Sequence, residues 1–375
     1  MSDAGGTSNT QGDANRASDT PAPARRRKLP WGKIIQTLVS VIVVVAIFGF
    51  AIPKFADYEE VGQILRDLTG QQIAYLLLAE ALNMATYWLV YVASLPGLRF
   101  WQAGVEVQTN SSIAGVLPAG GAFAVGITYS MLGSWGFSAA KVTEAIAVSG
   151  IWNIGIKLVM PVAAVLGLLA IGESSHGLVI GALIGVAAVL VAGALIGLVL
   201  WKESLARSIG AFGNRAASWM LRLIHKGPVT GLDEQVVAFR SEVVTVASRR
   251  WLLLTITAIL SQAGSFLVFY LSMRFVGIGA SQVNFIEIFT AYAFGQLVGT
   301  VPITPSGLGT ADAVYIALMA AAGASNNAAT AGDLLFRTLT WAIPIPIGAM
   351  TYVIWRVNKR WRVPVAADVQ EPASA

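Results

Sequence analysis

The sequence predicts an all-α polytopic membrane protein, an inverted-repeat helical bundle with two re-entrant or broken helix hairpins. Three observations support this fold class. Hydrophobic residues make up 55% of the 375 residues and charged residues only 12%, whereas soluble domains contain about 25% charged residues. Apolar runs long enough to cross a bilayer recur along the chain. Two further apolar segments are interrupted by Gly and Pro, and they resemble each other.

Six apolar runs are candidate membrane spans. A spanning helix needs about 20 mostly apolar residues. The runs that qualify are Ile34–Ile52, Ile73–Leu95, Ala145–Ile171, Leu178–Trp201, Trp251–Met273 and Leu334–Trp355. The first run follows a long polar leader without a small-residue cleavage site, so we expect it to remain in the protein as an uncleaved span.

The distribution of Lys and Arg predicts the orientation, because positive residues mark the cytoplasmic side of a membrane protein. They cluster before the first run, in the polar stretch 201–250 and near the C-terminus, while the segment after the first run is net acidic. We therefore expect both termini to lie inside, in the cytoplasmic membrane of a bacterium. For the crossings to alternate, the first broken segment must begin and end inside, and the second must begin and end outside.

This count of crossings divides the chain into five parts. A stretch within the connector, 203–224, has apolar residues near one face and Arg on the other, which fits a helix on the inner membrane surface or an ordinary linker helix. The parts are a disordered N-terminus at 1–30, a first half at 31–200 with its broken segment at 108–132, the cytoplasmic connector at 201–250, a second half at 251–356 with its broken segment at 285–322, and a disordered tail at 357–375.

The two broken segments share a pattern. "IAGVLPAGGAFAVGITYSML" (113–132) and "LVGTVPITPSGLGTADAVYIALM" (297–319) each contain Gly-x-x-Pro, a Gly-rich turn and an apolar helix with a Tyr. Such interruptions at corresponding positions of two oppositely oriented halves are the signature of an inverted-repeat transporter. The alternative is a chance alignment of apolar sequence. The expected turn residues are Gly115, Pro118, Gly120, Gly121, Gly299, Pro302, Pro305, Gly307 and Gly309.

Broken segments at membrane depth need partners for their free backbone groups, so each is expected to face a polar cavity. Proline ends a helix and glycine permits a tight turn. The helix that restarts after each turn directs free N–H groups and the positive end of its dipole toward the cavity. The pattern therefore predicts an anion site suited to phosphate.

Charged residues inside spans are candidate functional groups, because their burial in a membrane is costly. Asp312 lies where the second broken segment restarts as a helix, so it either serves function or only caps the turn. Arg337 is expected near the outer end of the last span, where it would pair with Asp312, bind phosphate or extend to the interface.

Further polar pairs lie one helical turn apart, where each member shares a face with its neighbour. Each pair either serves function or is a buried structural pair. The candidate substrate-binding residues are Asp312, Arg337, Lys157, Glu80, Asn153 and Glu287, of which Glu80 is paired with Asn83, Lys157 with Asn153 and Glu287 with Asn284.

Several functions are not expected. The chain has no Cys, and its two His residues fall in predicted loops, so no metal site, catalytic triad or cofactor is expected. It lacks the P-loop pattern of ATPases, and no extramembrane segment is long enough for a catalytic domain. We expect no enzyme activity. The basic residues lie beside apolar runs, which indicates membrane orientation and no nucleic-acid partner.

The second half carries a family resemblance. "VPITPSGLGTAD", followed about 25 residues later by "RTLTWAIPIPIG", resembles the transmembrane region of lysylphosphatidylglycerol synthases over roughly residues 30–360. Ser306 stands where the family's turn has Gly, and Asp312 where it has Glu. The matching positions are Pro305, Gly307, Leu308, Gly309 and Asp312 in the turn, and Arg337 and Pro344 in the last span.

The resemblance implies a flippase-like transporter that moves a polar or anionic phospholipid, including an aminoacylated one, or a lipid-linked precursor between leaflets. The chain resembles the membrane part alone, so synthase activity is not implied. Its expected partners are membrane lipids, with a separate lipid-modifying enzyme and a homo-oligomer left open. Two alternatives remain: a secondary transporter of a small soluble anion, and a membrane scaffold for cell-envelope lipid synthesis.

Overall fold

The computed structural model describes residues 58–116, 120–172, 187, 191, 232–301, 304–358 and 361. These residues form helices joined by short turns, and no strand occurs among them. Four of the helical stretches are long and apolar enough to cross a membrane: Gly70–Ser94, Ala139–Ala170, Arg249–Phe275 and Asn326–Val357. The predicted fold class, an all-α polytopic membrane protein, is confirmed. The predicted span Ile34–Ile52, the connector helix at 203–224 and the predicted disordered N-terminus lie outside the described residues. The predicted span Leu178–Trp201 lies outside them except for residues 187 and 191. The predicted disordered tail lies outside them except for residues 357, 358 and 361, and its first residue, Val357, still belongs to the last helix.

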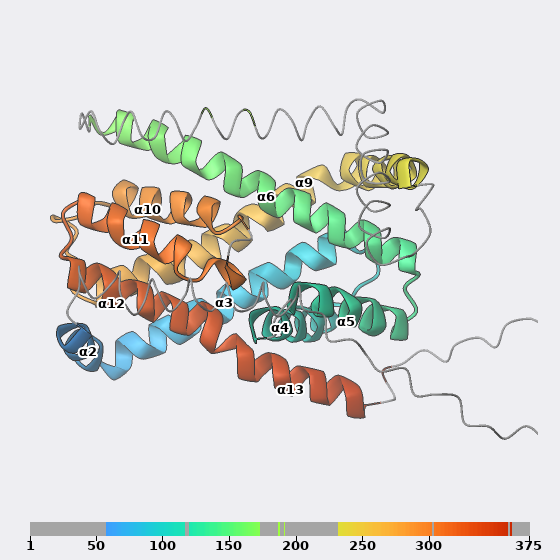
Figure 1. Cartoon of the computed structure of the whole chain (residues 1–375), viewed down its shortest axis with the longest axis horizontal. Helices are drawn as coiled ribbons and strands as arrows, with labels where there is room; N and C mark the ends of the chain where they lie inside the picture. Colours follow the sequence, from blue (N-terminus) through green and yellow to red (C-terminus); the bar gives the residue numbers. More distant parts are fainter. Residues whose placement is uncertain are drawn as a thin grey trace, which may run out of the picture.

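Apart from a short helix at the start of the first half, the helices follow one order in both halves: a long helix, a pair of short helices, then another long helix (Figure 1). The first half contains α2 (Tyr58–Arg66), α3 (Gly70–Ser94), α4 (Phe100–Val116), α5 (Gly120–Ser134) and α6 (Ala139–Ala170). The second half contains α9 (Leu232–Phe275), α10 (Phe285–Val298), the 3₁₀ turn η3 (Pro305–Gly307), α11 (Thr310–Ala321), α12 (Asn326–Arg337), the π-helical turn η4 (Thr338–Ala342) and α13 (Pro344–Val357). Its first helix, α9, begins within the predicted connector at 201–250 and continues without a break into the predicted span.

Polar caps fix where several helices begin. The Thr69 hydroxyl accepts a hydrogen bond from the Gln72 N–H, and the Gln72 side chain accepts one from the Thr69 N–H, which together form a capping box at the start of α3. Ser325 caps α12 through the Ala328 N–H. The last long helix therefore begins at Asn326, earlier than the predicted Leu334, because a cap and not the onset of the apolar run decides its first residue.

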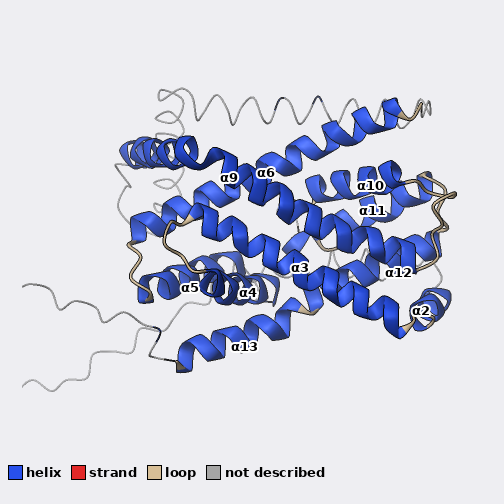
Figure 2. Ribbon diagram, turned by 180° about the vertical axis from the view of Figure 1, so that it is seen from behind, coloured by secondary structure: helices blue, strands red, loops and turns tan. Residues whose placement is uncertain are grey.

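The two short-helix pairs lie at opposite ends of the long helices, α4 and α5 at one end and α10 and α11 at the other (Figures 1 and 2). Hereafter α4–α5 is the first hairpin and α10–α11 the second hairpin. The first hairpin packs on α13, which belongs to the second half, and the second hairpin packs on α6, which belongs to the first half. Each half therefore packs against the hairpin of the other half. The first long helices of the two halves, α3 and α9, also pack together.

Glycines bring the helices of the two halves close together. A Cβ atom at Gly348 of α13 would lie 2.0 Å from the Gln108 carbonyl oxygen of α4, and one at Gly264 of α9 would lie 2.7 Å from the Thr86 hydroxyl of α3. Small residues at contacts are typical of membrane helices, because lipid tails are as apolar as the side chains and close packing has to drive association.

The surface of the long helices is apolar. Leu78 of α3 is 68% exposed, Leu166 of α6 is 62% exposed and Leu252 of α9 is 55% exposed. Large exposed apolar side chains are costly in water, and along several helices of one bundle they indicate contact with hydrocarbon. This surface and the four spans identify an integral membrane protein.

Candidate functional site

A polar cavity of about 350 Å³ lies among the four long helices and both hairpins. The side chains that line it are mostly amides, hydroxyls and charged groups, although the helices that carry them are apolar outside. They come from α3 (Glu80, Asn83, Met84, Tyr87), α4 (Gln108, Ser111), α6 (Asn153, Lys157), α9 (Ser261, Gln262, Ser265), α10 (Gln296), η3 (Ser306), η4 (Thr340) and α13 (Pro344).

A second cavity of about 230 Å³ adjoins the first, and it extends toward the tip of the second hairpin. Arg337, Tyr315 and Gly299 line only this second cavity. Lining both are Lys157, Ser265, Gln296, Ser306 and Thr340. Because these shared residues form the border, we treat the two cavities together as the polar cavity.

The tip of the second hairpin is built from a chain turn that helical residues cannot form. Ser306 has φ 54°, Gly307 has φ 68° and Gly309 has φ 82°, in the region that favours glycine. A Cβ atom at Gly307 would also lie 2.9 Å from the Gly299 Cα atom. The turn after Pro305 thus needs glycine at two of the predicted positions, while Ser306 accepts a strained backbone at the edge of the cavity.

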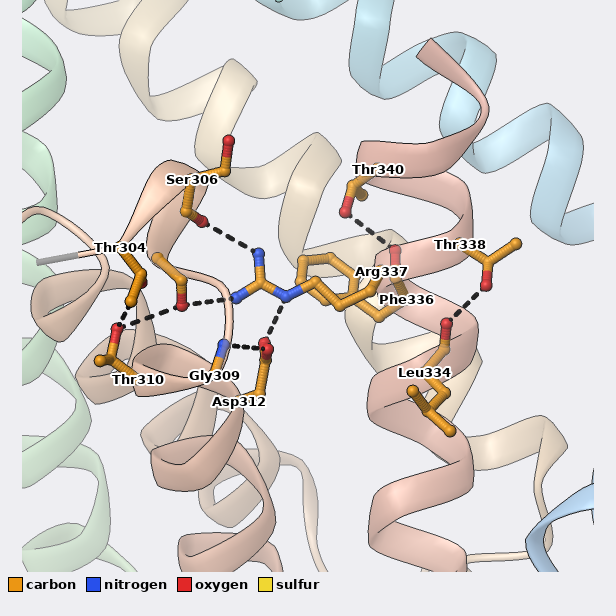
Figure 3. A network of polar contacts seen from close by, with 11 residues as sticks. Thr304, Ser306, Gly309, Thr310, Asp312, Leu334, Phe336, Arg337, Thr338 and Thr340 are labelled. Carbon is orange, nitrogen blue, oxygen red and sulfur yellow. Dashed lines mark hydrogen bonds and ion pairs between the residues drawn. The ribbon is translucent and has the colours of Figure 1, made fainter. Parts of the chain in front are cut away.

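Asp312 and Arg337 lock this turn in place. Asp312 is fully buried, and one carboxylate oxygen accepts a hydrogen bond from the Gly309 N–H at 2.7 Å. The other oxygen accepts one from the Arg337 Nε–H. The guanidinium also donates to the carbonyl oxygens of Ser306 at 3.3 Å and Gly307 at 3.5 Å (Figure 3). Asp312 therefore closes the turn and pairs with Arg337.

This arrangement changes the expected anion site at α11. The carboxylate of Asp312 already occupies the N-terminal end of α11, where it accepts the Gly309 N–H and faces the positive end of the helix dipole. An incoming anion would compete with it. Arg337 also lies well inside the last long helix and not near its outer end as predicted, because that helix begins at Asn326.

Lys157 is the cation best placed for a ligand. It lies midway along α6 and lines both parts of the polar cavity. No hydrogen bond or ion pair joins its side chain to another residue in the described part of the chain. Arg337 lines the cavity too, but its guanidinium is committed to Asp312 and to two carbonyl oxygens. The ammonium of Lys157 is therefore available to an anion.

The other predicted residues divide between the cavity and the helix ends. Glu80 accepts a hydrogen bond from the Asn83 amide at 3.0 Å, and both line the polar cavity together with Asn153. Glu287 lies elsewhere: it forms a capping box with Asn284 at the start of α10 and lines none of the cavities described. The sequence grouped Glu287 with the substrate-binding residues because a capping carboxylate and a cavity carboxylate look alike in an apolar segment.

The remaining predicted turn residues differ in their surroundings. A Cβ atom at Gly115 would lie 3.0 Å from the Trp341 Nε1 atom, whereas one at Gly121 would meet nothing within 4 Å. Gly120 begins α5. Pro118 and Pro302 lie outside the described residues.

Two buried acids were not among the residues predicted from the sequence. Glu106 of α4 is 1% exposed, and one of its carboxylate oxygens accepts a hydrogen bond from the Thr128 hydroxyl of α5 at 2.5 Å. Asp333 of α12 is fully buried, and neither of its carboxylate oxygens has a hydrogen-bond partner among the described residues. The sequence did contain signals for both. Glu106 lies just before the first broken segment, and Asp333 lies one turn before Arg337 on the same helix face.

Comparison with known proteins agrees with this architecture. The family model described as the lysylphosphatidylglycerol synthase transmembrane region matches residues 37–348. The chain belongs to this family. A search of curated proteins found none that matches it. In this member of the lysylphosphatidylglycerol synthase transmembrane family, the matched region includes both hairpins and every residue that lines the polar cavity.

The chemistry available in this family member is recognition of a polar or anionic group. The cavity offers amide and hydroxyl groups, the Glu80 carboxylate and the Lys157 ammonium group. The ammonium group and the neutral donors suit phosphate and its esters, and the carboxylate suits a cationic or hydroxyl-bearing part of the same ligand. Within the described ranges no cluster of three or more His, Asp or Glu side chains could hold a metal ion.

Proposed function

We propose that the protein is a flippase-like transporter, which moves a polar or anionic phospholipid between the leaflets of a bacterial cytoplasmic membrane with both termini inside. The observation that carries the proposal is the polar cavity with Lys157 at its wall, enclosed by an apolar bundle and bordered by both hairpins. Family membership supports a role that involves lipids. The lipid leaves as it enters, so the proposal includes no enzymatic step.

The polar cavity supplies what a lipid headgroup needs at membrane depth. Moving a charged headgroup through hydrocarbon without partners is costly, and the cavity replaces water with amides, hydroxyls and an ammonium group. Its position between hairpins at opposite ends of the bundle supports access from either leaflet. We propose that Lys157 binds the phosphate, while Glu80 and Asn153 contact the rest of the headgroup.

Reconstituted protein tests the proposal directly. Proteoliposomes that contain headgroup-labelled phosphatidylglycerol should lose label to an external quencher faster than protein-free vesicles do. Lys157→Gln should slow this loss by about tenfold, which corresponds to about 1.4 kcal/mol of lost phosphate binding. Lys141→Gln is the matched control, because Lys141 lies on the same helix but is exposed and lines none of the cavities described. Equal rates for the two variants would contradict the assignment of Lys157.

A soluble anion is the second candidate cargo. It is favoured by the polar lining of the cavity and by the volume of its larger part, about 350 Å³, which would admit a small anion such as phosphate. Uptake of radiolabelled phosphate into the same proteoliposomes, without movement of labelled lipid, would select this candidate over the first.

A further inference from the structure

An apolar groove of about 390 Å³ lies beside the polar cavity, between α6, α9 and the start of α10. Its lining is aliphatic and aromatic except for one amide. The residues are Ile156, Val159, Met160 and Ala163 of α6, Ile259, Gln262, Ala263 and Phe266 of α9, and Phe285, Ile286 and Phe289 of α10. We refer to this space as the apolar groove.

The apolar groove and the polar cavity share a wall. Gln262 lines both, and it is held in place because its side-chain oxygen accepts a hydrogen bond from the buried Tyr292 hydroxyl at 3.0 Å. On α6, Ile156 lines the groove and the next residue, Lys157, lines the cavity. Successive residues on a helix point about 100° apart, so the ammonium group and the hydrocarbon surface border one another.

The groove opens toward the hydrocarbon of the membrane. Val159 is 59% exposed, Ile259 is 51% exposed and Phe285 is 52% exposed, whereas Met160 beneath them is 7% exposed. An alkyl chain can therefore enter from the side between three helices without crossing the polar cavity. A small soluble anion has no use for such an opening.

We infer that the apolar groove and the polar cavity form one binding site for a two-part ligand, with the acyl chain of a phospholipid in the groove and its phosphate at Lys157. The inference rests on the proposed function for the choice of a lipid as occupant. Gln262 stands at the boundary, where the ester-linked glycerol of the lipid would lie. The bilayer is as apolar as the groove, so the acyl chain gains little free energy by entering it. The groove instead positions the lipid, because it holds the acyl chain beside the cavity while the headgroup enters.

Photocrosslinking tests this site independently of transport. The probe is phosphatidylglycerol with a diazirine in one acyl chain, incorporated with the full-length protein in nanodiscs, and labelled peptides are located by mass spectrometry. We expect labels to concentrate on the groove-lining segments of α6, α9 and α10. Ala263→Trp, which fills the groove, should reduce this labelling about tenfold, the change that a loss of about 1.4 kcal/mol produces.

Two further variants guard against a folding artefact. Ala163→Phe fills the groove from the opposite wall on α6 and should reduce the labelling in the same direction. Ala349→Trp is the matched control, because Ala349 is exposed on α13 and lines none of the cavities described. The thermal unfolding of each variant in detergent is compared with that of the wild type. If one groove variant unfolds at a lower temperature, the labelling result is taken from the other groove variant.

The outcomes separate the inference from the proposed function. Labels spread evenly over all lipid-facing helices, and unchanged by either groove variant, overturn the two-part site even if the protein moves lipid. Groove-centred labels in a protein that moves no lipid overturn the proposed function and support the site. Groove-centred labels that both groove variants abolish, with lipid movement slowed in the same variants, support both.

Discussion

The two hairpins share one sequence pattern, but different contacts hold them in the bundle. The second hairpin is fixed at its tip, where Arg337 of α12 binds Asp312 and two carbonyl oxygens of the turn. The first hairpin is fixed along its length on α13, where the Ser112 hydroxyl donates to the Ile345 carbonyl at 2.9 Å and the Thr109 and Thr351 hydroxyls lie 2.9 Å apart.

Their buried acids differ in the same way. Asp312 has a cationic partner, whereas Glu106 of the first hairpin meets the Thr128 hydroxyl and the Asn110 amide, and no ion pair involves it within the described part of the chain. The difference shows that the second hairpin uses charge to fix its tip, whereas the first uses close packing and neutral hydrogen bonds. Variants that remove one kind of fastening at a time should therefore affect the two hairpins unequally.

The largest effect is expected when the ion pair between Asp312 and Arg337 loses one partner. Arg337→Gln leaves the Asp312 carboxylate buried without a counter-ion, which typically costs about 3–5 kcal/mol. We expect this loss in the free energy of unfolding, measured by denaturant titration in detergent micelles. The double variant Asp312→Asn/Arg337→Gln removes both charges and should recover part of it. A double variant less stable than Arg337→Gln would mean that the two residues act separately.

The next effect tests the packing of the first hairpin. Gly348→Ala places a Cβ atom 2.0 Å from the Gln108 carbonyl oxygen, which forces α13 away from α4. Overpacking of this kind costs about 1–3 kcal/mol, and thermal unfolding should report it as a lowered midpoint. Gly126→Ala on α5 is the control, since its Cβ atom would meet nothing within 4 Å. If both variants unfold alike, the close approach of α13 and α4 is not what holds the first hairpin.

A smaller effect is expected for a single polar contact of the first hairpin. Ser112→Ala removes the hydrogen bond to the Ile345 carbonyl oxygen, a loss of about 1 kcal/mol. Ser130→Ala is the comparison, because the Ser130 hydroxyl bonds only within its own helix and is exposed. Stability curves that coincide for the two variants would show that the Ser112 contact does not fasten α4 to α13.

The smallest effect is expected at the acid without a cation. Glu106→Gln keeps an oxygen that can accept the Thr128 hydrogen bond and removes no ion pair, so the stability should change by less than about 1 kcal/mol. Asp312→Asn, the equivalent change in the second hairpin, removes the partner of Arg337 and should cost several times more. Similar losses for Glu106→Gln and Asp312→Asn would erase the distinction between the two hairpins.

The sequence predicted the features that depend on local chemistry. Gly307 and Gly309 mark a turn because few other residues adopt its backbone, and an Asp and an Arg in apolar segments are conspicuous enough that their pairing was one of the expected alternatives. The sequence missed Asp333 and Glu106, since an acid within an otherwise helical pattern does not reveal which cavity or neighbour it faces.

Features that depend on packing between distant segments could not be predicted. Apolar residues cover all sides of a membrane helix, so periodicity does not show that the first hairpin sits on α13 and the second on α6. The contact of Gly348 with Gln108 joins residues from opposite halves of the chain, and nothing local to either glycine or amide encodes it.

The π-helical turn η4 connects the residues that hold the second hairpin to the helix that holds the first. It lies between Arg337, which holds the second hairpin, and α13, which seats the first, and its wide turn is closed by a hydrogen bond from the Ile343 N–H to the Thr338 carbonyl oxygen at 2.9 Å. A π turn inserts one residue into the helical phase, which rotates everything after it by about 100° relative to an uninterrupted α-helix. That phase shift lets a single helix present Arg337 to one hairpin and Gly348 to the other. Removing one residue from η4 would restore a regular helix and turn Gly348 away from α4, so the spacing of this segment is as much a determinant of the architecture as its side chains.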